Sequence, residues 1–227
     1  MKINKAIIMA AGRGMRMMPF TDKKPKAMAP YAGSTLISNG IDAISKYIPE
    51  IHITVGYKGA MLASHVIEHN AASVFNTEGK DNSWWLYNTL MKYVDSPIFV
   101  LTCDNVVELD FESLEKDYFE AGSPACMVVP VKPVKGLEGD YIVKDGALIN
   151  DLTRKIKTEM YCSGIQILNP KKINTITEKS DNFYGVWKQL IAQKQLYCSN
   201  IYPKKWYAVD NLIQLEEINK LKEKKAI

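Results

Sequence analysis

The fold is decided near the N-terminus, where Ala6-Ile7-Ile8-Met9-Ala10-Ala11 runs directly into Gly12-Arg13-Gly14-Met15-Arg16. An apolar run of this length that ends in glycine predicts a strand buried on both faces of a sheet. The glycines permit a tight turn in which successive backbone N–H groups face a ligand, because no Cβ stands between them and it. The strand and the turn together predict an anion site at the edge of a sheet.

Basic side chains surround this turn. Arg13 and Arg16 carry planar guanidinium groups that suit paired contacts with phosphate oxygens, and Lys26 follows as a compact charge. A polyphosphate such as a nucleoside triphosphate fits this set better than a neutral ligand does. The alternative is a glycine-rich surface turn flanked by solubilising charges.

Two better-known phosphate loops do not match the turn. A Walker loop requires Gly-x-x-x-x-Gly-Lys-Ser/Thr, and a dinucleotide fingerprint requires a third glycine at the position of Met17. That fingerprint also needs an acid about twenty residues further on, and the segment from Tyr31 to Thr35 contains none. A dinucleotide-dependent oxidoreductase is therefore disfavoured.

A longer pattern around the turn resembles the signature of the sugar-phosphate nucleotidylyltransferase superfamily. The run from Ala10 to Pro19 is followed by Thr21 and by Lys24-Pro25-Lys26-Ala27-Met28. The resemblance implies transfer of a nucleotide from a nucleoside triphosphate to a phosphorylated metabolite, with release of pyrophosphate, and catalytic roles for Arg16 and Lys26. The nucleotide-binding residues that it implies are Ala10, Ala11, Gly12, Arg13, Gly14, Asn82 and Ser83.

The region around Asn82 and Ser83 bears on the choice of nucleotide. Both stand at the start of a predicted helix, where they either cap the helix or recognise a pyrimidine edge. This Asn-containing stretch, together with Asp104-Asn105, resembles the compact bacterial phosphocholine cytidylyltransferases. The short chain also resembles the sugar-phosphate uridylyltransferases, so CTP or UTP is favoured.

Two acids follow apolar runs and are candidate metal ligands. Asp104 ends the run from Ile98, and Asp210 ends Trp206-Tyr207-Ala208-Val209. Ligands of open α/β sheets bind at the carboxyl edge of the strands, and two hard oxygen ligands beside phosphates favour Mg²⁺. The resemblance implies that Asp104 and Asp210 are the two metal acids. The alternative for each acid is the cap of a local turn.

The acceptor site is less clearly marked. Where the superfamily has a Glu-Lys pair that grips sugar hydroxyls, this chain has Arg154-Lys155, which disfavours an ordinary hexose phosphate or favours an acceptor with a further negative group. Three tryptophans, Trp84, Trp85 and Trp206, form either an aromatic box for a quaternary ammonium or parts of the core. The resemblance implies acceptor contacts from Gly139, Asp140, Lys155 and Gly164.

Alternating apolar runs and amphipathic segments predict an α/β fold. We expect a Rossmann-like, mixed and mainly parallel sheet flanked by helices, of the nucleotide-diphospho-sugar transferase type. Asp145-Gly146 between two short apolar runs predicts a hairpin. We expect one domain over residues 1–227, without the C-terminal β-helix that many relatives carry. Strands are predicted at 6–10, 51–55, 98–101, 126–131 and 162–168, and helices over 36–47, 83–93, 183–195 and 212–224.

The composition is that of an ordinary globular protein. Among 227 residues, 29 Lys and Arg stand against 25 Asp and Glu, and this small excess does not indicate nucleic-acid binding. The four cysteines form no C-x-x-C pair and are expected to be reduced, buried thiols. No signal peptide or membrane span is predicted, so we expect a cytoplasmic monomer or homodimer without membrane contact.

The sequence thus predicts a Mg²⁺-dependent nucleotidylyltransferase for cell-envelope precursors. It would join CTP or UTP to a sugar phosphate or a similar acceptor; the acceptor itself stays open. The alternatives are a cytidylyltransferase for phosphocholine or an aminoalkylphosphonate, and a non-catalytic nucleotide-binding module. The presence of Arg16, Lys26, Asp104 and Asp210 together disfavours the module, because binding alone does not require both acids.

Overall fold

The computed structural model describes residues 2–134 and 139–223, and the chain divides into two compact units. The first, called here the loop unit, contains Asn4–Gly79, Leu101–Glu108 and the segment that starts at Lys205. The second, called here the hairpin unit, contains the first residues of the chain, Lys80–Val100 and Leu109–Lys204.

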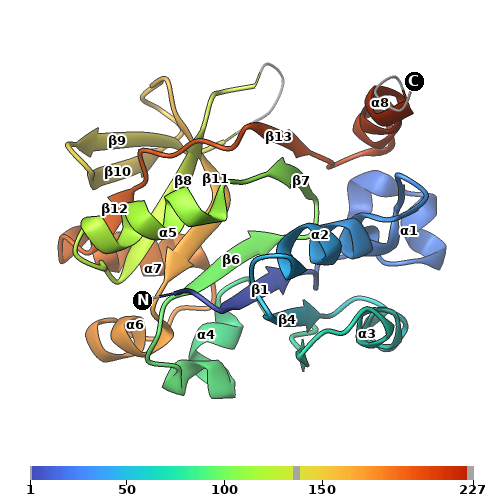
Figure 1. Ribbon diagram of the computed structural model, residues 1–227, viewed down its shortest axis with the longest axis horizontal. Coiled ribbons are helices and arrows are strands. Elements are labelled where there is room, and N and C mark those ends of the chain that lie inside the picture. Colours follow the sequence, from blue (N-terminus) through green and yellow to red (C-terminus); the bar gives the residue numbers. More distant parts are fainter. Residues whose placement is uncertain (1, 135–138, 224–227) are drawn as a thin grey trace. The chain divides into compact units, whose positions relative to one another are not determined.

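The loop unit is built on three parallel strands. Strand β1 (Lys5–Met9) pairs with β4 (Glu50–Val55), and β4 pairs with β5 (Ser73–Asn76). The three central side chains of β1 are buried, which is why the strand reads as an apolar run without alternation. Helices α2 (Leu36–Ser45) and α3 (Gly59–Glu68) precede and follow β4 along the chain, and both pack against it (Figure 1).

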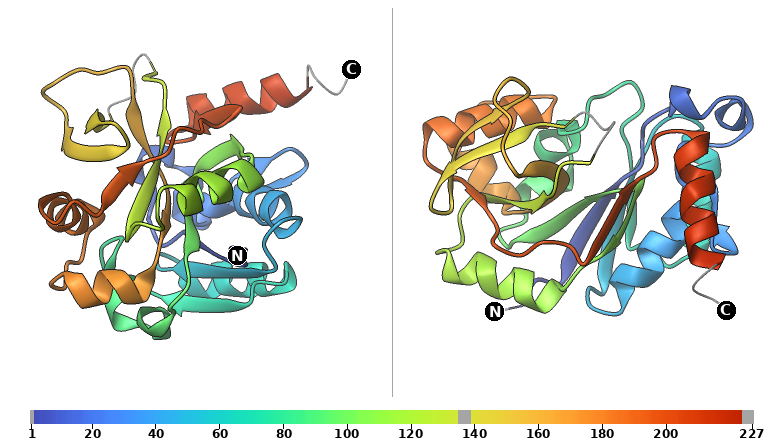
Figure 2. Two further views of the ribbon diagram at one scale, coloured as in Figure 1. Left: turned by 60° about the vertical axis from the view of Figure 1, so that its left-hand side comes forward. Right: turned by 90° about the horizontal axis from the view of Figure 1, so that it is seen from above.

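The C-terminal segment of the loop unit packs on its N-terminal segment. Strand β7 (Asn105–Glu108) pairs with β13 (Lys205–Ala208) in an antiparallel ribbon, and α8 (Leu212–Glu223) follows (Figure 2). A buried cluster joins Met17, Ala29, Tyr31, Leu36, Val209, Leu215 and Ile218. The remaining short elements are η1 (Met15–Met17), α1 (Phe20–Lys23), η2 (Lys26–Met28), β2 (Pro30–Tyr31) and β3 (Ser34–Thr35).

The hairpin unit contains a mixed sheet with strand order β6-β11-β8-β12-β10-β9. Among the described strands of this order, β12 pairs with β8 in parallel, and the other neighbours pair antiparallel. Strand β6 is shared by both units, because its last residues belong to the loop unit. The strands are β6 (Ile98–Thr102), β8 (Cys126–Val131), β9 (Tyr141–Asp145), β10 (Leu148–Thr153), β11 (Tyr161–Leu168) and β12 (Leu196–Cys198).

Side-chain caps fix where three helices of the hairpin unit begin. Asp110, Asn169 and Asn182 each stand at an N-cap and accept a hydrogen bond from a backbone amide three residues later, which satisfies a donor that the helix leaves free. The helices of this unit are α4 (Trp84–Asn88), η3 (Leu90–Tyr93), α5 (Phe111–Glu120), α6 (Pro170–Ile176) and α7 (Phe183–Ala192).

The predicted fold class is confirmed: a mixed sheet flanked by helices, with the hairpin at Asp145-Gly146 in place. The described residues contain no β-helix. The prediction of one helix over 83–93 is wrong. Thr89 has an extended backbone between α4 and η3, and its hydroxyl accepts from the amide of Met91, so this β-branched residue ends one helix and caps the next. Within the described residues, no helix combines the length and apolar character needed to cross a bilayer.

The four cysteines are free. Cys126 and Cys198 are buried as predicted, whereas Cys103 and Cys162 are only half-buried. Burial raises the pKa of the thiols of Cys103 and Cys162 to about 12 and that of Cys198 to about 11. All three thiols are therefore protonated at neutral pH.

We expect the native protein to react slowly with a colorimetric disulfide reagent at pH 8. The thiolate is the reactive form, and at a pKa of about 12 it makes up only about 1 in 10⁴ of a thiol at this pH. In guanidinium chloride the four thiols should react at the rate of a small free thiol. Rapid reaction of Cys103 or Cys162 in the native state, identified by mass spectrometry, would contradict this.

Candidate active site

In the turn after β1, hydrogen bonds fix the carbonyl groups at the two ends. The carbonyl of Ala11 accepts a hydrogen bond from the amide of Tyr57 (3.1 Å), and the carbonyl of Gly14 accepts one from the amide of Met17 (2.9 Å). Within the described part of the chain, the amides of residues 12–16 donate no hydrogen bond. A row of unpaired amides in an exposed turn is the arrangement that binds phosphate oxygens.

Gly14 allows Lys26 to pass close to the turn. Its φ of +69° favours glycine, and a Cβ built on it would lie 2.7 Å from the Cβ of Lys26. The side chain of Lys26 therefore runs directly against the turn. The second glycine of the motif is explained by this contact as well as by the backbone conformation.

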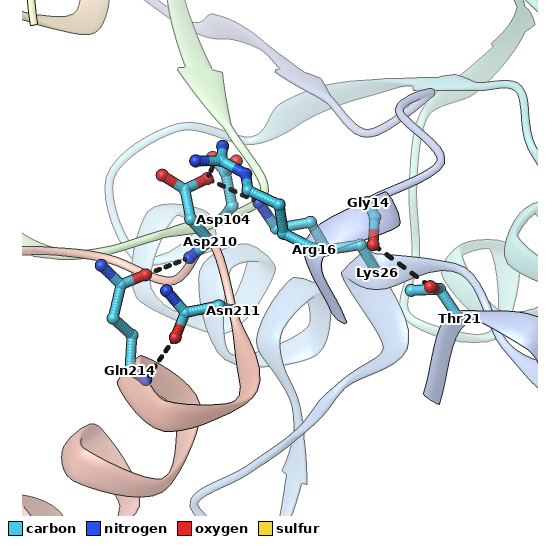
Figure 3. A network of polar contacts seen from close by, with 8 residues as sticks. All are labelled: Gly14, Arg16, Thr21, Lys26, Asp104, Asp210, Asn211 and Gln214. Atoms are coloured by element: carbon cyan, nitrogen blue, oxygen red, sulfur yellow. Dashed lines mark hydrogen bonds and ion pairs between the residues drawn. The ribbon is translucent and has the colours of Figure 1, made fainter. Parts of the chain in front are cut away.

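Lys26 joins the two candidate metal acids. Its Nζ lies 2.8 Å from Oδ2 of Asp104 and 3.1 Å from Oδ1 of Asp210 (Figure 3). Nη2 of Arg16 lies 3.0 Å from the same oxygen of Asp210. The structure thus brings together four residues that the sequence analysis singled out, from three distant segments.

The carboxylates of Asp104 and Asp210 keep the side chain of Lys26 protonated. Burial by itself lowers the pKa of this ammonium, but the neighbouring Asp104 and Asp210 outweigh burial and raise the pKa above its usual value. Lys26 is therefore a permanent cation at neutral pH. Asp104 and Asp210 have their negative charge balanced locally by Lys26 and Arg16.

Backbone pairing holds the two acids together. The amide of Val209 donates to the carbonyl of Asp104 (2.8 Å), next to the Ala208–Asn105 pair of the β7–β13 ribbon. The ribbon therefore fixes Asp104 and Asp210 at its end. The carboxyl groups of both acids pair with Lys26, and their role as metal ligands stays a prediction.

Two residues that the sequence analysis missed support Asp210. Oδ1 of Asn211 accepts from the amide of Gln214, and Oε1 of Gln214 accepts from the amide of Asp210 (2.6 Å) (Figure 3). The spacing Asn-x-x-Gln before an apolar helix is close to a capping box, and that signal would have located both residues.

The donors at this site are of the type that magnesium prefers. Oδ2 of Asp104 and Oδ1 of Asp210 both approach the ammonium of Lys26, at 2.8 Å and 3.1 Å, so two hard oxygen ligands converge on one point. Among the described residues, no group of three or more His, Cys, Asp and Glu side chains is placed to hold a metal. A site with two carboxylates and phosphate oxygens from a substrate is the usual way in which proteins hold Mg²⁺.

Asn82 and Ser83 lie in the hairpin unit and are engaged in local bonds. Oδ1 of Asn82 accepts from the amide of Phe183 (2.8 Å), and the hydroxyl of Ser83 donates to the carbonyl of Ser180 (2.6 Å). Ser83 occupies the N-cap position of α4 without a side-chain cap bond. The capping role is therefore wrong for Ser83, and the nucleotide role stays a prediction.

The predicted acceptor residues also lie in the hairpin unit. Nε of Arg154 pairs with Oδ1 of Asp140 (2.9 Å), so the base that replaces the superfamily's acid neutralises a neighbouring acid. A Cβ on Gly139 would lie 2.9 Å from the ring of Tyr161, and Gly164 has a φ of +81°. Lys155 is exposed, and its amide donates to the hydroxyl of Thr153.

The three tryptophans have different surroundings. Trp85 is 1% exposed and contacts the ring of Phe183, as a core residue does. Trp84 lies under the ammonium of Lys80 at 5.7 Å. Both belong to the hairpin unit, whereas Trp206 is on β13 of the loop unit.

Solved structures share the fold. An inositol-1-phosphate CTP transferase from T. maritima superposes with a TM-score of 0.81 at 16% identity, covering 99% of this chain and 96% of that chain. A CTP:phosphocholine cytidylyltransferase from Streptococcus pneumoniae gives 0.76 at 20% identity, covering 97% and 99%. At these identities the similarity establishes the fold alone.

Curated relatives are similar in sequence. The bifunctional protein GlmU of Methanocaldococcus jannaschii is 28% identical over 180 residues, 77% of this chain and 42% of the relative. A mannose-1-phosphate guanyltransferase of Candida albicans is 26% identical over 209 residues, 85% of this chain and 58% of the relative. The chain therefore spans about half the length of the curated relatives it matches.

The contact between Gly14 and Lys26 makes a testable prediction. Gly14→Ala and Gly33→Ala both place a Cβ at a positive φ, which costs about 1 kcal/mol of unfolding free energy. Only Gly14→Ala also meets a neighbour, because nothing lies within 4 Å of a Cβ at Gly33. We expect the larger loss in Gly14→Ala, measured by denaturant unfolding; equal losses would show that Lys26 moves aside without cost.

One family model covers nearly the whole chain. The model described as nucleotidyl transferase matches residues 5–225, a range that includes the turn, Lys26 and both acids. The chain therefore belongs to the nucleotidyl transferase family.

Proposed function

We propose that this protein transfers a nucleotide from a nucleoside triphosphate to a phosphorylated acceptor and releases pyrophosphate. One observation carries the proposal: an exposed row of unpaired amides at residues 12–16 lies in the same unit as a lysine that touches two carboxylates. Phosphate binding explains the amides, and control of charge during phosphoryl chemistry explains the lysine and the acids. Family membership supports the same reading.

The residues have separate tasks in this reaction. The amides of the turn, with Arg13 and Arg16, bind the triphosphate, whose charges are spread over several oxygens. Lys26 is a fixed cation beside the turn and stabilises negative charge that develops as the α-phosphorus is attacked. Binding both phosphates in line makes the transfer effectively unimolecular, so no covalent enzyme intermediate is required.

Asp104 and Asp210 are proposed to hold Mg²⁺. When bound, the ion would reduce the mutual repulsion of the phosphate groups and polarise the phosphoryl oxygens. The two acids then have a second role, because they orient Lys26 through the ion pairs described above.

We also propose specific substrates, which family membership alone does not identify. We favour CTP or UTP with a sugar phosphate, in the cytoplasm and as a step toward cell-envelope precursors. The names of the relatives support a sugar phosphate, since they include a mannose-1-phosphate guanyltransferase. A phosphocholine or aminoalkylphosphonate acceptor is the second candidate, because Arg154 is tied to Asp140 where the superfamily pattern has an acid that grips sugar hydroxyls.

The proposal predicts pyrophosphate release in a panel that pairs CTP, UTP, GTP, ATP and dTTP with phosphorylated acceptors. We expect turnover with at least one pair and a loss of about 100-fold or more in Asp104→Asn and Asp210→Asn. Asp42→Asn, an exposed acid on α2, is the control and should keep full activity. Triphosphate binding without turnover by the folded protein would indicate a non-catalytic module instead, and turnover retained in either carboxylate variant would exclude that acid as a required ligand.

Lys26→Met makes a separate prediction about the metal. The substitution removes the cation between two carboxylates, so we expect free Mg²⁺ or Mn²⁺ to raise the melting temperature more in Lys26→Met than in the wild type, while turnover is lost. Lys46→Met, an exposed lysine at the end of α2, should respond as the wild type does. The same metal response in all three proteins would show that Lys26 does not compete with the ion for the two carboxylates.

A further inference from the structure

The turn between β4 and α3 lies directly against the phosphate-binding turn. A Cβ on Gly56 would lie 2.6 Å from the carbonyl oxygen of Ala11, so only glycine fits at this position. The next residue, Tyr57, donates its amide to the same carbonyl at 3.1 Å. Lys58 follows with a φ of +52°, which turns the chain into α3.

The hydroxyl of Tyr57 reaches the other end of the phosphate-binding turn. It donates to the carbonyl of Thr21 at 2.8 Å, and the hydroxyl of Thr21 donates to the carbonyl of Gly14 at 3.1 Å. Thr21 is 2% exposed, so water does not compete for these bonds. The backbone amide of Tyr57 thus bonds directly to the carbonyl of Ala11. The hydroxyl of Tyr57 is linked to the carbonyl of Gly14 through Thr21.

Because the peptide group is planar, a hydrogen bond that fixes the carbonyl of one residue also fixes the direction of the next residue's amide. In a trans peptide the C=O of one residue and the N–H of the next point in opposite directions in the same plane. The bond to the carbonyl of Ala11 therefore directs the amide of Gly12 away from Tyr57. The bond to the carbonyl of Gly14 directs the amide of Met15 away from the hydroxyl of Thr21. Both amides belong to the unpaired row at residues 12–16.

The ring of Tyr57 also positions a guanidinium. Cζ of Arg13 lies 5.1 Å from the ring centroid, in cation–π contact. Among the described residues Arg13 forms no ion pair, so this ring is the contact that limits where its guanidinium lies. Nζ of Lys58 lies 5.4 Å from the same ring and adds a second cation there.

We propose that Tyr57 is a positioning residue for the triphosphate: it sets the direction of the turn amides and holds Arg13 toward the phosphates. The inference rests on the proposed function, because it assumes a triphosphate at this turn. Tyr57 touches no reacting atom in this scheme. Its loss should therefore weaken nucleotide binding and leave the chemical step nearly unchanged.

Two substitutions separate the ring contact of the Tyr57 side chain from its hydroxyl bond, and both leave in place the backbone amide that donates to Ala11. Tyr57→Phe keeps the ring over which Arg13 lies and removes the bond to Thr21, whereas Tyr57→Leu removes both. We expect the Kd for the triphosphate, measured by calorimetry, to rise about 3-fold in Tyr57→Phe and about 10-fold or more in Tyr57→Leu. KM for the triphosphate should rise in parallel, and kcat should stay within about 2-fold.

A double-variant cycle tests whether Arg13 is the partner. In an Arg13→Gln background, Tyr57→Leu should weaken binding no more than Tyr57→Phe does, because the cation is already gone. Tyr93→Leu is the control, since Tyr93 is an exposed tyrosine whose ring also lies under a lysine, at 4.8 Å from Lys92, and belongs to the hairpin unit. Its triphosphate affinity should equal that of the wild type.

The outcomes distinguish this inference from the proposed function. If the wild type turns over and Tyr57→Leu has the same triphosphate affinity and KM as the wild type, the positioning role is overturned and the proposed function stays intact. A fall in kcat without a change in KM would overturn it as well, because it would place Tyr57 in the chemical step. Absence of both binding and turnover in the wild type would overturn the proposed function itself, and with it the role of Tyr57.

Discussion

The pair of contacts from one ammonium to two carboxylates is the interaction on which the candidate site depends. Lys26 lies beside the N-terminal turn, Asp104 follows β6, and Asp210 precedes α8, so one cation joins three segments that are far apart in the sequence. Such partly buried charges persist only when each has a partner. The β7–β13 ribbon and the cap of α8 hold the acids where Lys26 reaches both, so the site is fixed by backbone pairing before any ligand binds.

The second constraint is on the peptide planes of the turn. Carbonyls at its two ends are engaged by neighbouring segments, and this leaves the amides of residues 12–16 free to bind an anion. Donors that are oriented before an anion binds need little reorganisation, which is the condition for effective electrostatic stabilisation. The turn, Arg13 and Arg16, which are proposed to bind the triphosphate, all belong to the loop unit, whereas Asn82 and Ser83, the other predicted nucleotide contacts, belong to the hairpin unit. The residues expected to contact the acceptor belong to the hairpin unit.

The sequence was sufficient to predict features that depend only on neighbouring residues. Glycines at 12 and 14, an apolar run before them and basic residues after them predicted β1 and the turn that follows it, and they singled out Arg16 and Lys26, which both pair with Asp210 in the structure. Asp145-Gly146 predicted the hairpin because that dipeptide suits one turn geometry. The helix over 83–93 failed because periodicity continues through Thr89, while the extended backbone of that residue is set by side-chain bonds that periodicity does not report.

By itself the sequence determined the class of fold and singled out the glycine turn and four charged residues as a candidate site, because each of these signals depends on residue type and short spacing. Only the tertiary structure decided that Lys26 lies between Asp104 and Asp210, that its pKa is raised rather than lowered, and that Tyr57 lies against the turn. These facts depend on pairing between segments up to 184 residues apart, as for Lys26 and Asp210. Pairing over such separations is set by the packing of the whole unit, and no local pattern in the chain encodes it.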